Sequence, residues 1–202
     1  MTVTSDIEAT SEVQTIGTLI IIRGNNESDP QRQLVVVKKE KTSSEGDPVY
    51  AKVSSVKSGK KYILVSYYGD TPYICSGLIS NKGLTMVNAS LIISNNEIPA
   101  TDTTNPYAVT ITEKSKGIYS VINSNGDGLK VSKGDISTGT SGIEWTITQR
   151  KEDDSFIISN TNTTDRALYI GNKGQSCKNY AISNFGTTGY ASTYMTLYEY
   201  SE

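Results

Sequence analysis

The chain has 202 residues, enough for one domain with a buried core, and a formal net charge of −2. This charge balance argues against the basic surface that nucleic acids or anionic membranes would select. The chain has no histidine, which excludes Ser-His-Asp and Cys-His catalytic systems and histidine zinc sites. No apolar run reaches the roughly 18 residues of a membrane-spanning helix, so we expect no membrane span.

The composition is typical of an all-β protein. Tyrosine occurs 13 times against 2 phenylalanines, alongside many residues that favour turns. The two cysteines, Cys75 and Cys177, are too few for a four-cysteine zinc site. They form either one disulfide or two free buried thiols, and sequence spacing leaves both alternatives open. We expect no metal and no cofactor.

The N-terminal part differs from the rest. Its first fifteen residues are polar, and 18–41, "TLIIIRGNNESDPQRQLVVVKKEK", contains two aliphatic runs around a turn-rich centre, which predicts a β-hairpin. We assign 1–54 to a tail with this hairpin and 55–202 to the main domain. The hairpin either covers one end of that domain or anchors the chain to a larger assembly by adding a strand to another sheet.

Three similar units follow the hairpin, at about 59–114, 115–150 and 151–200. Each unit begins with an aromatic strand and a turn, continues with a Leu-containing strand, a Lys-Gly turn and a variable stretch, and ends with a Thr-containing strand. The first strands are "KKYILVS", "KGIYSVINS" and "DDSFIISNT"; the Leu segments are "GLISNKG", "GLKVSKG" and "ALYIGNKG"; the last strands are "AVTITEK", "EWTITQR" and "YMTLYEY".

Repeats of about 40 residues without helices indicate a closed barrel with threefold pseudosymmetry or a propeller. A propeller typically needs about 4–8 blades, so three units favour a β-trefoil-like barrel. If this is right, Val109, Trp145 and Met195 occupy equivalent positions.

The segment "NSNGDG" (123–128) could be a calcium loop or a turn between strands. An EF-hand loop would place a bidentate Glu at its twelfth position, where this chain has Gly134. Asn-Gly and Asp-Gly accept positive φ at little cost. The segment is therefore predicted to be a turn.

Residues 59–202 resemble a β-rich domain found at the C-termini of secreted and surface proteins of gut Bacteroidota and Clostridia. The resemblance rests on "KKYILVS", "GIYSVINSNGDGLKVS", "EWTITQRKEDDSFIISN", "ALYIGNKG" and the terminal "YMTLYEY". It implies an adhesive or binding role outside the cell.

The layout is also similar to that of ricin-type lectin domains, which are β-trefoils with a Gln-x-Trp signature near the end of each unit. Here Ile143 and Glu144 precede Trp145, and the equivalent residues of the other units are Val109 and Met195. We therefore interpret Trp145 as a core residue.

Paired acids are the remaining catalytic candidates. Glu152, Asp153 and Asp154 in "KEDDS" are adjacent, and adjacent acids on a strand point to opposite faces, so a solvated turn is the better interpretation. We expect no enzyme activity.

A sugar-binding surface fits the sequence better. The loop "YYGDTPY" offers Tyr67, Tyr68, Asp70 and Tyr73, although alternation places some of these tyrosines in the barrel wall. A second candidate loop, "NTNTTDR", offers the side chains of Asn160, Asn162, Asp165 and Arg166.

These observations predict a non-catalytic extracellular binding module for a glycan or surface polymer. The alternative is a structural or decoration protein of a virion or surface assembly, anchored through 1–54. The first residues, "MTVTSDIEATSEVQ", lack the features of a signal peptide. Cytoplasmic location, a removed signal and release within a virus particle all remain open.

Overall fold

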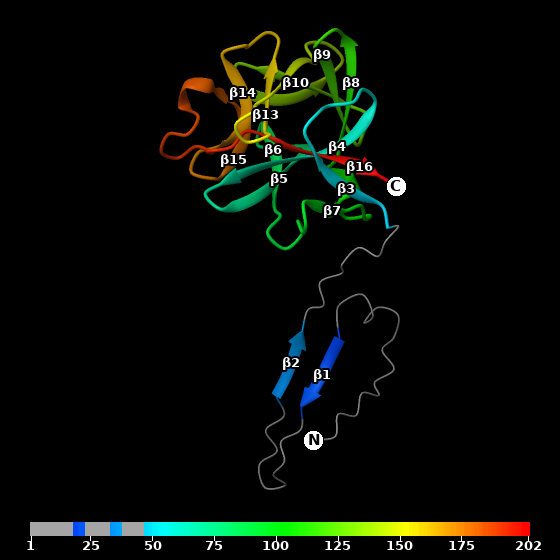
Figure 1. The fold of residues 1–202 in the computed structure, drawn as a ribbon. Helices are drawn as coiled ribbons and strands as arrows, with labels where there is room; N and C mark the ends of the chain where they lie inside the picture. Colours follow the sequence, from blue (N-terminus) through cyan, green and yellow to red (C-terminus); the bar gives the residue numbers. More distant parts are fainter. Residues whose placement is uncertain (1–17, 23–32, 38–46) are drawn as a thin grey trace. The chain divides into compact units, whose positions relative to one another are not determined.

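The computed structural model describes residues 18–22, 33–37 and 47–202, with side chains for 47–202 (Figure 1). The chain divides into two compact parts, 1–44 and 45–202. In the N-terminal part, β1 (Thr18–Ile22) pairs antiparallel with β2 (Gln33–Val37), from Thr18 opposite Val37 to Ile22 opposite Gln33. The predicted N-terminal hairpin is therefore confirmed. The polar tail, 1–15, and residues 38–41 lie outside the described residues.

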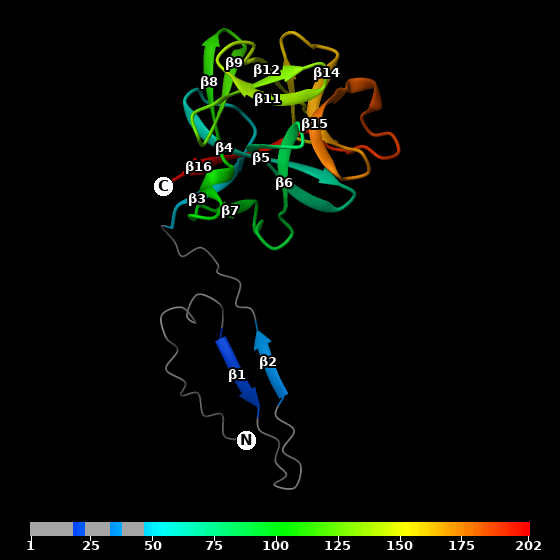
Figure 2. The ribbon, with the colours of Figure 1, turned by 180° about the vertical axis from the view of Figure 1, so that it is seen from behind.

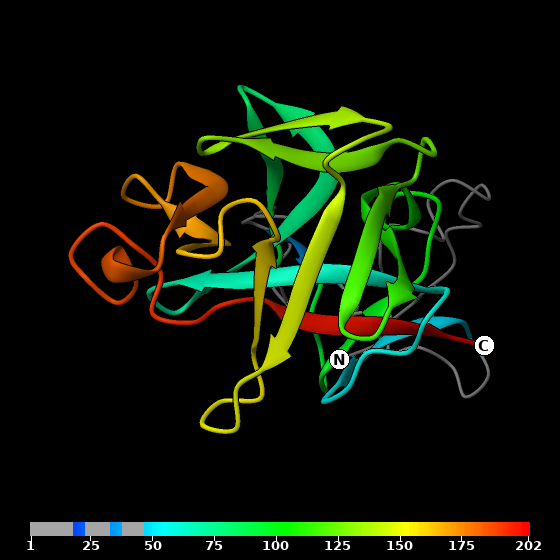
Figure 3. The same ribbon diagram turned by 90° about the horizontal axis from the view of Figure 1, so that it is seen from above.

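The C-terminal part, 45–202, is built on a closed barrel of six strands. In order around its wall these are β4 (Lys60–Tyr68), β8 (Val109–Ser115), β9 (Ile118–Asn123), β12 (Glu144–Gln149), β13 (Phe156–Asn160) and β16 (Thr196–Ser201). The ring closes because β16 pairs with β4 and a bridge joins Phe156 to Met195. Figure 3 shows β16, in red, running beside β4, in cyan. A closed wall leaves no open sheet edge within the barrel.

Three hairpins complete the architecture, one in each unit of the repeat. They pair β5 (Thr71–Ser80) with β6 (Gly83–Asn88), β10 (Gly128–Ser132) with β11 (Asp135–Gly139), and β14 (Arg166–Gly171) with β15 (Ser176–Ala181). The second of these lies behind the barrel in Figure 1 and faces the viewer in Figure 2. Each of the three repeat units thus contributes four strands, two to the barrel and two to a hairpin. This arrangement is the predicted β-trefoil.

The third strand of each unit was not predicted. The stretches after the Lys-Gly turns, interpreted as variable, form β6, β11 and β15. Their sequences share no motif, although the three strands meet: β6 pairs with β15, and β11 contacts both.

The predicted equivalence of Val109, Trp145 and Met195 is confirmed. Each is paired across the sheet with the aromatic residue that opens its own unit. The pairs are Tyr62 with Val109, Tyr119 with Trp145, and Phe156 with Met195. Trp145 is fully buried, and its Nε1–H donates to the carbonyl oxygen of Leu129 at 2.9 Å. It is a core residue, as expected.

The Lys-Gly turns explain another part of the repeat. Lys82, Lys133 and Lys173 all have positive φ, between 56° and 61°. This left-handed backbone is uncommon outside glycine and reverses the chain tightly between two strands. The Lys-Gly pair of each repeat therefore marks an equivalent hairpin turn.

The "NSNGDG" segment is a turn between β9 and β10, as predicted. The Asn123 Oδ1 accepts hydrogen bonds from the backbone N–H groups of Asn125 and Asp127, and Gly126 has a φ of 87°. Among the residues with described side chains, no group of three or more acidic or cysteine side chains is placed to hold a metal ion.

One strand of the C-terminal part, 45–202, begins before the expected boundary at 54/55. β3 (Val49–Val53) pairs with β16 on one side and with the short β7 (Glu97–Pro99) on the other. The structural boundary therefore lies at 44/45. The sequence did not reveal this, because "VYAKV" follows a turn-rich break but finds its partner at the far end of the chain.

β3 and the 89–108 segment create a second core outside the barrel. Its buried members are Tyr50, Ile63, Val65, Ile74, Ala89, Ile98, Ala108 and Tyr198. β4 alternates between the two cores, since Tyr62 and Leu64 face the main core while Ile63 and Val65 face the second. This double burial explains why residues 62–65 form an unbroken apolar run.

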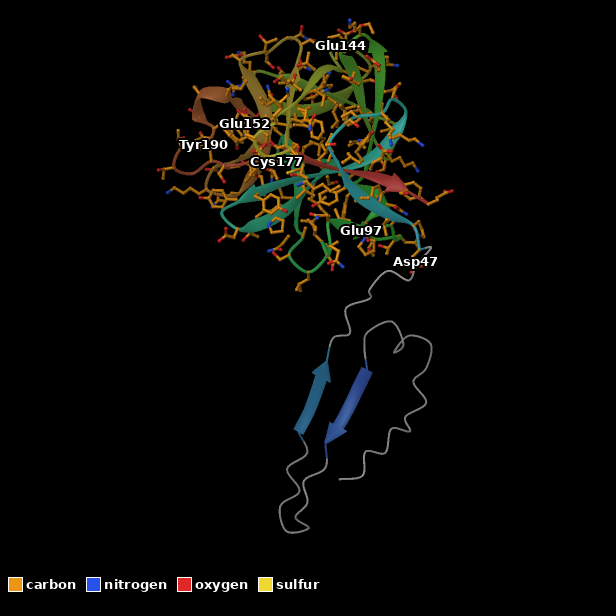
Figure 4. The ribbon with its side chains drawn as sticks, viewed as in Figure 1. Asp47, Glu97, Glu144, Glu152, Cys177 and Tyr190 are labelled. Atoms are coloured by element: carbon orange, nitrogen blue, oxygen red, sulfur yellow. The ribbon has the colours of Figure 1, made fainter. Side chains whose placement is uncertain are left out.

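Helical structure in the described chain is limited to two 3₁₀ turns, η1 (Asn105–Tyr107) and η2 (Ile182–Asn184), and neither could cross a membrane. Cys75 and Cys177 are free and fully buried. Figure 4 places Cys177 inside the domain. Burial raises the pKa of the Cys177 thiol well above its usual value, and a hydrogen bond with Cys75 adds to the rise.

Candidate ligand-binding surface

The first candidate loop is the tip of the β4–β5 hairpin, which we call the tyrosine hairpin (67–73). Tyr68 is paired with Thr71 and Ser66 with Tyr73. Because directly paired residues share a face and successive residues alternate, Tyr68 and Tyr73 lie on one face, and Tyr67 lies on the other. The sequence brought these tyrosines together in one loop, and the register separates them.

Tyr67 belongs to the second core. It packs against that cluster, its backbone N–H donates to Thr193 Oγ1, and its side chain is hydrogen-bonded to Tyr198. Burial raises the pKa of Tyr198, and the neighbouring Tyr67 raises it further. These contacts give Tyr67 a structural role in the wall.

Tyr68 and Tyr73 present a different environment. Both are half-buried and pack on the main core, so part of each ring reaches the surface. The ring of Tyr68 lies against Gly174, where an added Cβ would come within 2.7 Å of the Tyr68 Cδ1 atom. Asp70 is exposed at the tip of the hairpin, next to Gly69, whose φ is 58°. The hairpin therefore combines two fixed rings with a free-standing carboxylate.

The second candidate loop, the β13–β14 loop (161–165), follows Asn160. Asn160 is fully buried, its Nδ2 donates to the carbonyl oxygens of Gly142 and Glu144, and its Oδ1 accepts the N–H of Asn162. Its amide is thus used within the chain. Asn162 and Asp165 are exposed.

Asn160 has equivalents in the other units that sequence reasoning missed. The equivalent residue lies four positions after the aromatic residue that opens each repeat unit. It is Ser66 in the first repeat, Asn123 in the second and Asn160 in the third. All three are buried, and each uses its side chain to bind a backbone group of a loop. The sequence feature that could have revealed these residues is a polar side chain placed near the end of each repeat's first strand.

The tyrosine hairpin and the β13–β14 loop occupy equivalent places in repeat units one and three, and a residue in or directly after each loop meets a Lys-Gly turn from another repeat unit. Tyr68 lies against Gly174 of the β14–β15 turn, and Arg166 lies against Gly134 of the β10–β11 turn. The backbone N–H of Asn179 also donates to the carbonyl oxygen of Gly134 at 3.3 Å. Both loops are therefore supported by a neighbouring unit.

An aromatic cluster near the end of the third unit was not predicted. The buried Tyr169 contacts Tyr180, Phe185, Tyr190 and Tyr194 at ring-centroid distances of 5.5 to 6.1 Å. Figure 4 shows Tyr190 at the rim of the domain. Burial, followed by the neighbouring tyrosines, raises the pKa of Tyr169. The rings hold the long 182–193 connection in place.

The acids of "KEDDS" are held in a turn by a neighbouring arginine. Asp153 Oδ2 lies 3.1 Å from Arg150 Nη1, and its Oδ1 accepts hydrogen bonds from both the N–H and the hydroxyl of Ser155. Glu152 lies 3.6 Å from Arg150 Nε. The Arg150 guanidinium is also within 5.4 Å of the ring centroids of Phe185 and Tyr194. This arrangement joins the end of β12 to the aromatic cluster.

No family model and no curated protein matches the chain. Solved structures that are similar to it include the following three. A designed threefold-symmetric protein, ThreeFoil, is 15% identical and covers 68% of this chain and 97% of its own, with a TM-score of 0.44. The Haemophilus ducreyi cytolethal distending toxin is 11% identical over 68% and 81%, with a TM-score of 0.46. The BEL β-trefoil is 16% identical over 70% and 95%, also with a TM-score of 0.46. At these identities the likeness concerns the fold alone.

Proposed function

We propose that the chain is a non-catalytic binding module that recognises a glycan or a surface polymer through the tyrosine hairpin. The observation that carries the proposal is the shared face of Tyr68 and Tyr73, two half-buried rings fixed on the main core beside the exposed Asp70. Their fixed position means that little side-chain freedom would be lost on binding.

The chemistry of these groups suits a sugar. The C–H face of a pyranose ring is apolar and can pack on a tyrosine ring, which carries a large apolar surface and a polar hydroxyl. The Asp70 carboxylate accepts hydrogen bonds from sugar hydroxyls. Asn162 and Asp165 of the β13–β14 loop offer a second polar patch, whereas Tyr67 and Asn160 are engaged within the fold.

We place the module outside the cell or on its surface. The resemblance to C-terminal domains of secreted and surface proteins of gut Bacteroidota and Clostridia supports this location.

A second candidate function is a structural role in a virion or surface assembly, anchored through 1–54. It is favoured by the β1–β2 pair, whose strands read "TLIII" and "QLVVV". An isolated two-stranded hairpin is marginally stable in water at best, so such a pair is expected to need a partner. Sedimentation would show assembly of the full chain and a monomer for 45–202; identical behaviour of the two would remove the anchor from consideration.

The test of the binding function is an array of mucin and bacterial surface glycans probed with the full chain. We expect saturable binding that is lost in Tyr68→Ala and Tyr73→Ala but retained in Tyr68→Phe, which keeps the ring face. Tyr200→Ala is the matched control, because Tyr200 is half-buried near the C-terminus and packs on Tyr50. Equal loss in Tyr200→Ala would assign the effect to stability, and absence of binding to every glycan would overturn the proposal.

A further inference from the structure

Arg166 differs from Arg150, the other arginine in 47–202, in the groups that surround it. Arg150 lies between two acids, Glu152 and Asp153, and below two aromatic rings. Arg166 takes part in none of the ion pairs found among the residues with described side chains. Its charge is therefore not neutralised by a bound carboxylate of this part of the chain.

The Arg166 side chain is nevertheless held in place. It is half-buried, and its Nε–H donates to the carbonyl oxygen of Asn179 at 2.9 Å. Its Nη2 lies over Gly134, where an added Cβ would be only 2.9 Å away. The absence of a side chain at Gly134 is what lets the guanidinium occupy this position.

Charges of both signs lie on the elements next to Arg166. Lys133 is exposed in the turn that carries Gly134, and Lys178 precedes Asn179. Asp135 is shared between Lys82, at 3.2 Å, and Lys178, at 3.4 Å. Hydrogen bonding by Lys82 is the main cause that lowers the pKa of this Asp135 carboxyl, which therefore stays ionised and engaged. Asp165 directly precedes Arg166 in the chain, and it is exposed.

We propose that Arg166 and the β10–β11 turn form an anion subsite that binds the carboxylate or sulfate of an acidic glycan. The terminal nitrogens of a guanidinium present parallel N–H groups that match the two oxygens of such an anion. The Nε hydrogen bond and the contact with Gly134 hold the guanidinium in place before binding, so less side-chain entropy is lost. The inference rests on the proposed function, since it names the class of glycan.

The first experiment needs no variant and no identified glycan. The full chain, labelled with ¹⁵N, is titrated with sodium glucuronate, with sodium sulfate and, as the neutral control, with glucose. We expect the Arg166 Nε–Hε resonance to shift saturably with both anions and not with glucose. The Arg150 resonance should stay unchanged, because its guanidinium is already paired. No saturable shift at Arg166, or equal shifts at both arginines, would overturn the inference.

A second experiment links the subsite to glycans. Sialylated and sulfated mucin glycopeptides are compared with their desialylated and unsulfated products. We expect the acidic members to bind the full chain more tightly, and Arg166→Gln to weaken that binding by about tenfold, the effect of losing a charged hydrogen bond. Arg166→Lys keeps the charge but not the paired N–H geometry, so its affinity should lie between those of the unchanged chain and of Arg166→Gln. Denaturant unfolding checks that both variants fold.

The outcomes separate the two proposals. Binding of neutral glycans through the tyrosine hairpin, with no response at Arg166, would retain the function and reject the subsite. A saturable shift at Arg166 without binding to any glycan would retain an anion site and reject the glycan function.

Discussion

The ring of Tyr68 rests on the backbone of Gly174, so that a Cβ at Gly174 would come within 2.7 Å of the Tyr68 Cδ1 atom. Gly174 belongs to the Lys-Gly turn of the third unit, whereas Tyr68 ends the first strand of the first unit. The proposed binding face is thus supported by parts of the chain that lie far apart in sequence.

This contact predicts that Gly174→Ala is more harmful than an alanine at a glycine in open space. Gly174 has a φ of 81° and Gly59 a φ of 78°, but nothing lies within 4 Å of an added Cβ at Gly59. Both variants should lose about 1 kcal/mol from the left-handed backbone, and Gly174→Ala a further 1–3 kcal/mol, roughly, from overpacking. Urea unfolding measures the difference; equal losses would mean that Tyr68 moves aside freely.

Asn160→Ala should destabilise the domain far more than Asn162→Ala. Asn160→Ala removes two hydrogen bonds from the buried Asn160 amide to backbone carbonyls and one from the N–H of Asn162, so the free energy of unfolding should fall by about 2 kcal/mol. Asn162→Ala alters an exposed side chain and should change it by less than about 0.5 kcal/mol. An Asn160→Ala variant of unchanged stability but weaker glycan binding would show that Asn160 contacts ligand instead.

The two boundaries, 44/45 and 54/55, can be distinguished by truncation. A chain of 45–202 should fold, because it keeps β3, whereas 55–202 loses β3 and the buried Tyr50 from the second core. Losing a large buried aromatic side chain alone costs about 3–5 kcal/mol. Circular dichroism and urea unfolding of both fragments would measure the loss. Equal stability would mean that β3 is an accessory strand.

Alkaline pH should destabilise the domain. Burial, with a smaller contribution from Tyr200, raises the pKa of Tyr50 to about 12 from its usual value of 10.0. A raised folded-state pKa means that the buried neutral phenol stabilises the fold fully below pH 10, and that this contribution is lost as pH rises from about 10 to 12.

The measurement is the free energy of unfolding between pH 8 and 12. It should be flat at first and then fall, and Tyr50→Phe should make the fall shallower, because phenylalanine has no proton to lose. A decline that begins well below the tyrosine range would point to another group.

The cysteines should be inert in the folded chain. Cys75 and Cys177 are fully buried, and the raised pKa of Cys177 leaves little thiolate to react. A thiol reagent such as 5,5′-dithiobis(2-nitrobenzoate) should therefore react slowly with native protein and fully, at both cysteines, in denaturant. If denatured protein reacts only after treatment with a reductant, the two thiols have been joined by a disulfide.

The sequence by itself determined the threefold repeat, and with it the barrel. Turn conformation at Lys82, Lys133 and Lys173 and the aromatic opening residues Tyr62, Tyr119 and Phe156 depend on short stretches of chain. Backbone preference and strand alternation act locally, so three copies of one local pattern could be recognised from the residues.

Tertiary structure alone decided which core or neighbouring loop each of those side chains faces. Tyr67 and Tyr68 are neighbours in sequence, yet the β4–β5 register sends one into the second core and leaves the other on Gly174. Asn160 is polar, yet it is buried because its amide meets carbonyl groups from the preceding unit. Both outcomes depend on pairing partners far away along the chain, and side-chain alternation has no information about where those partners lie.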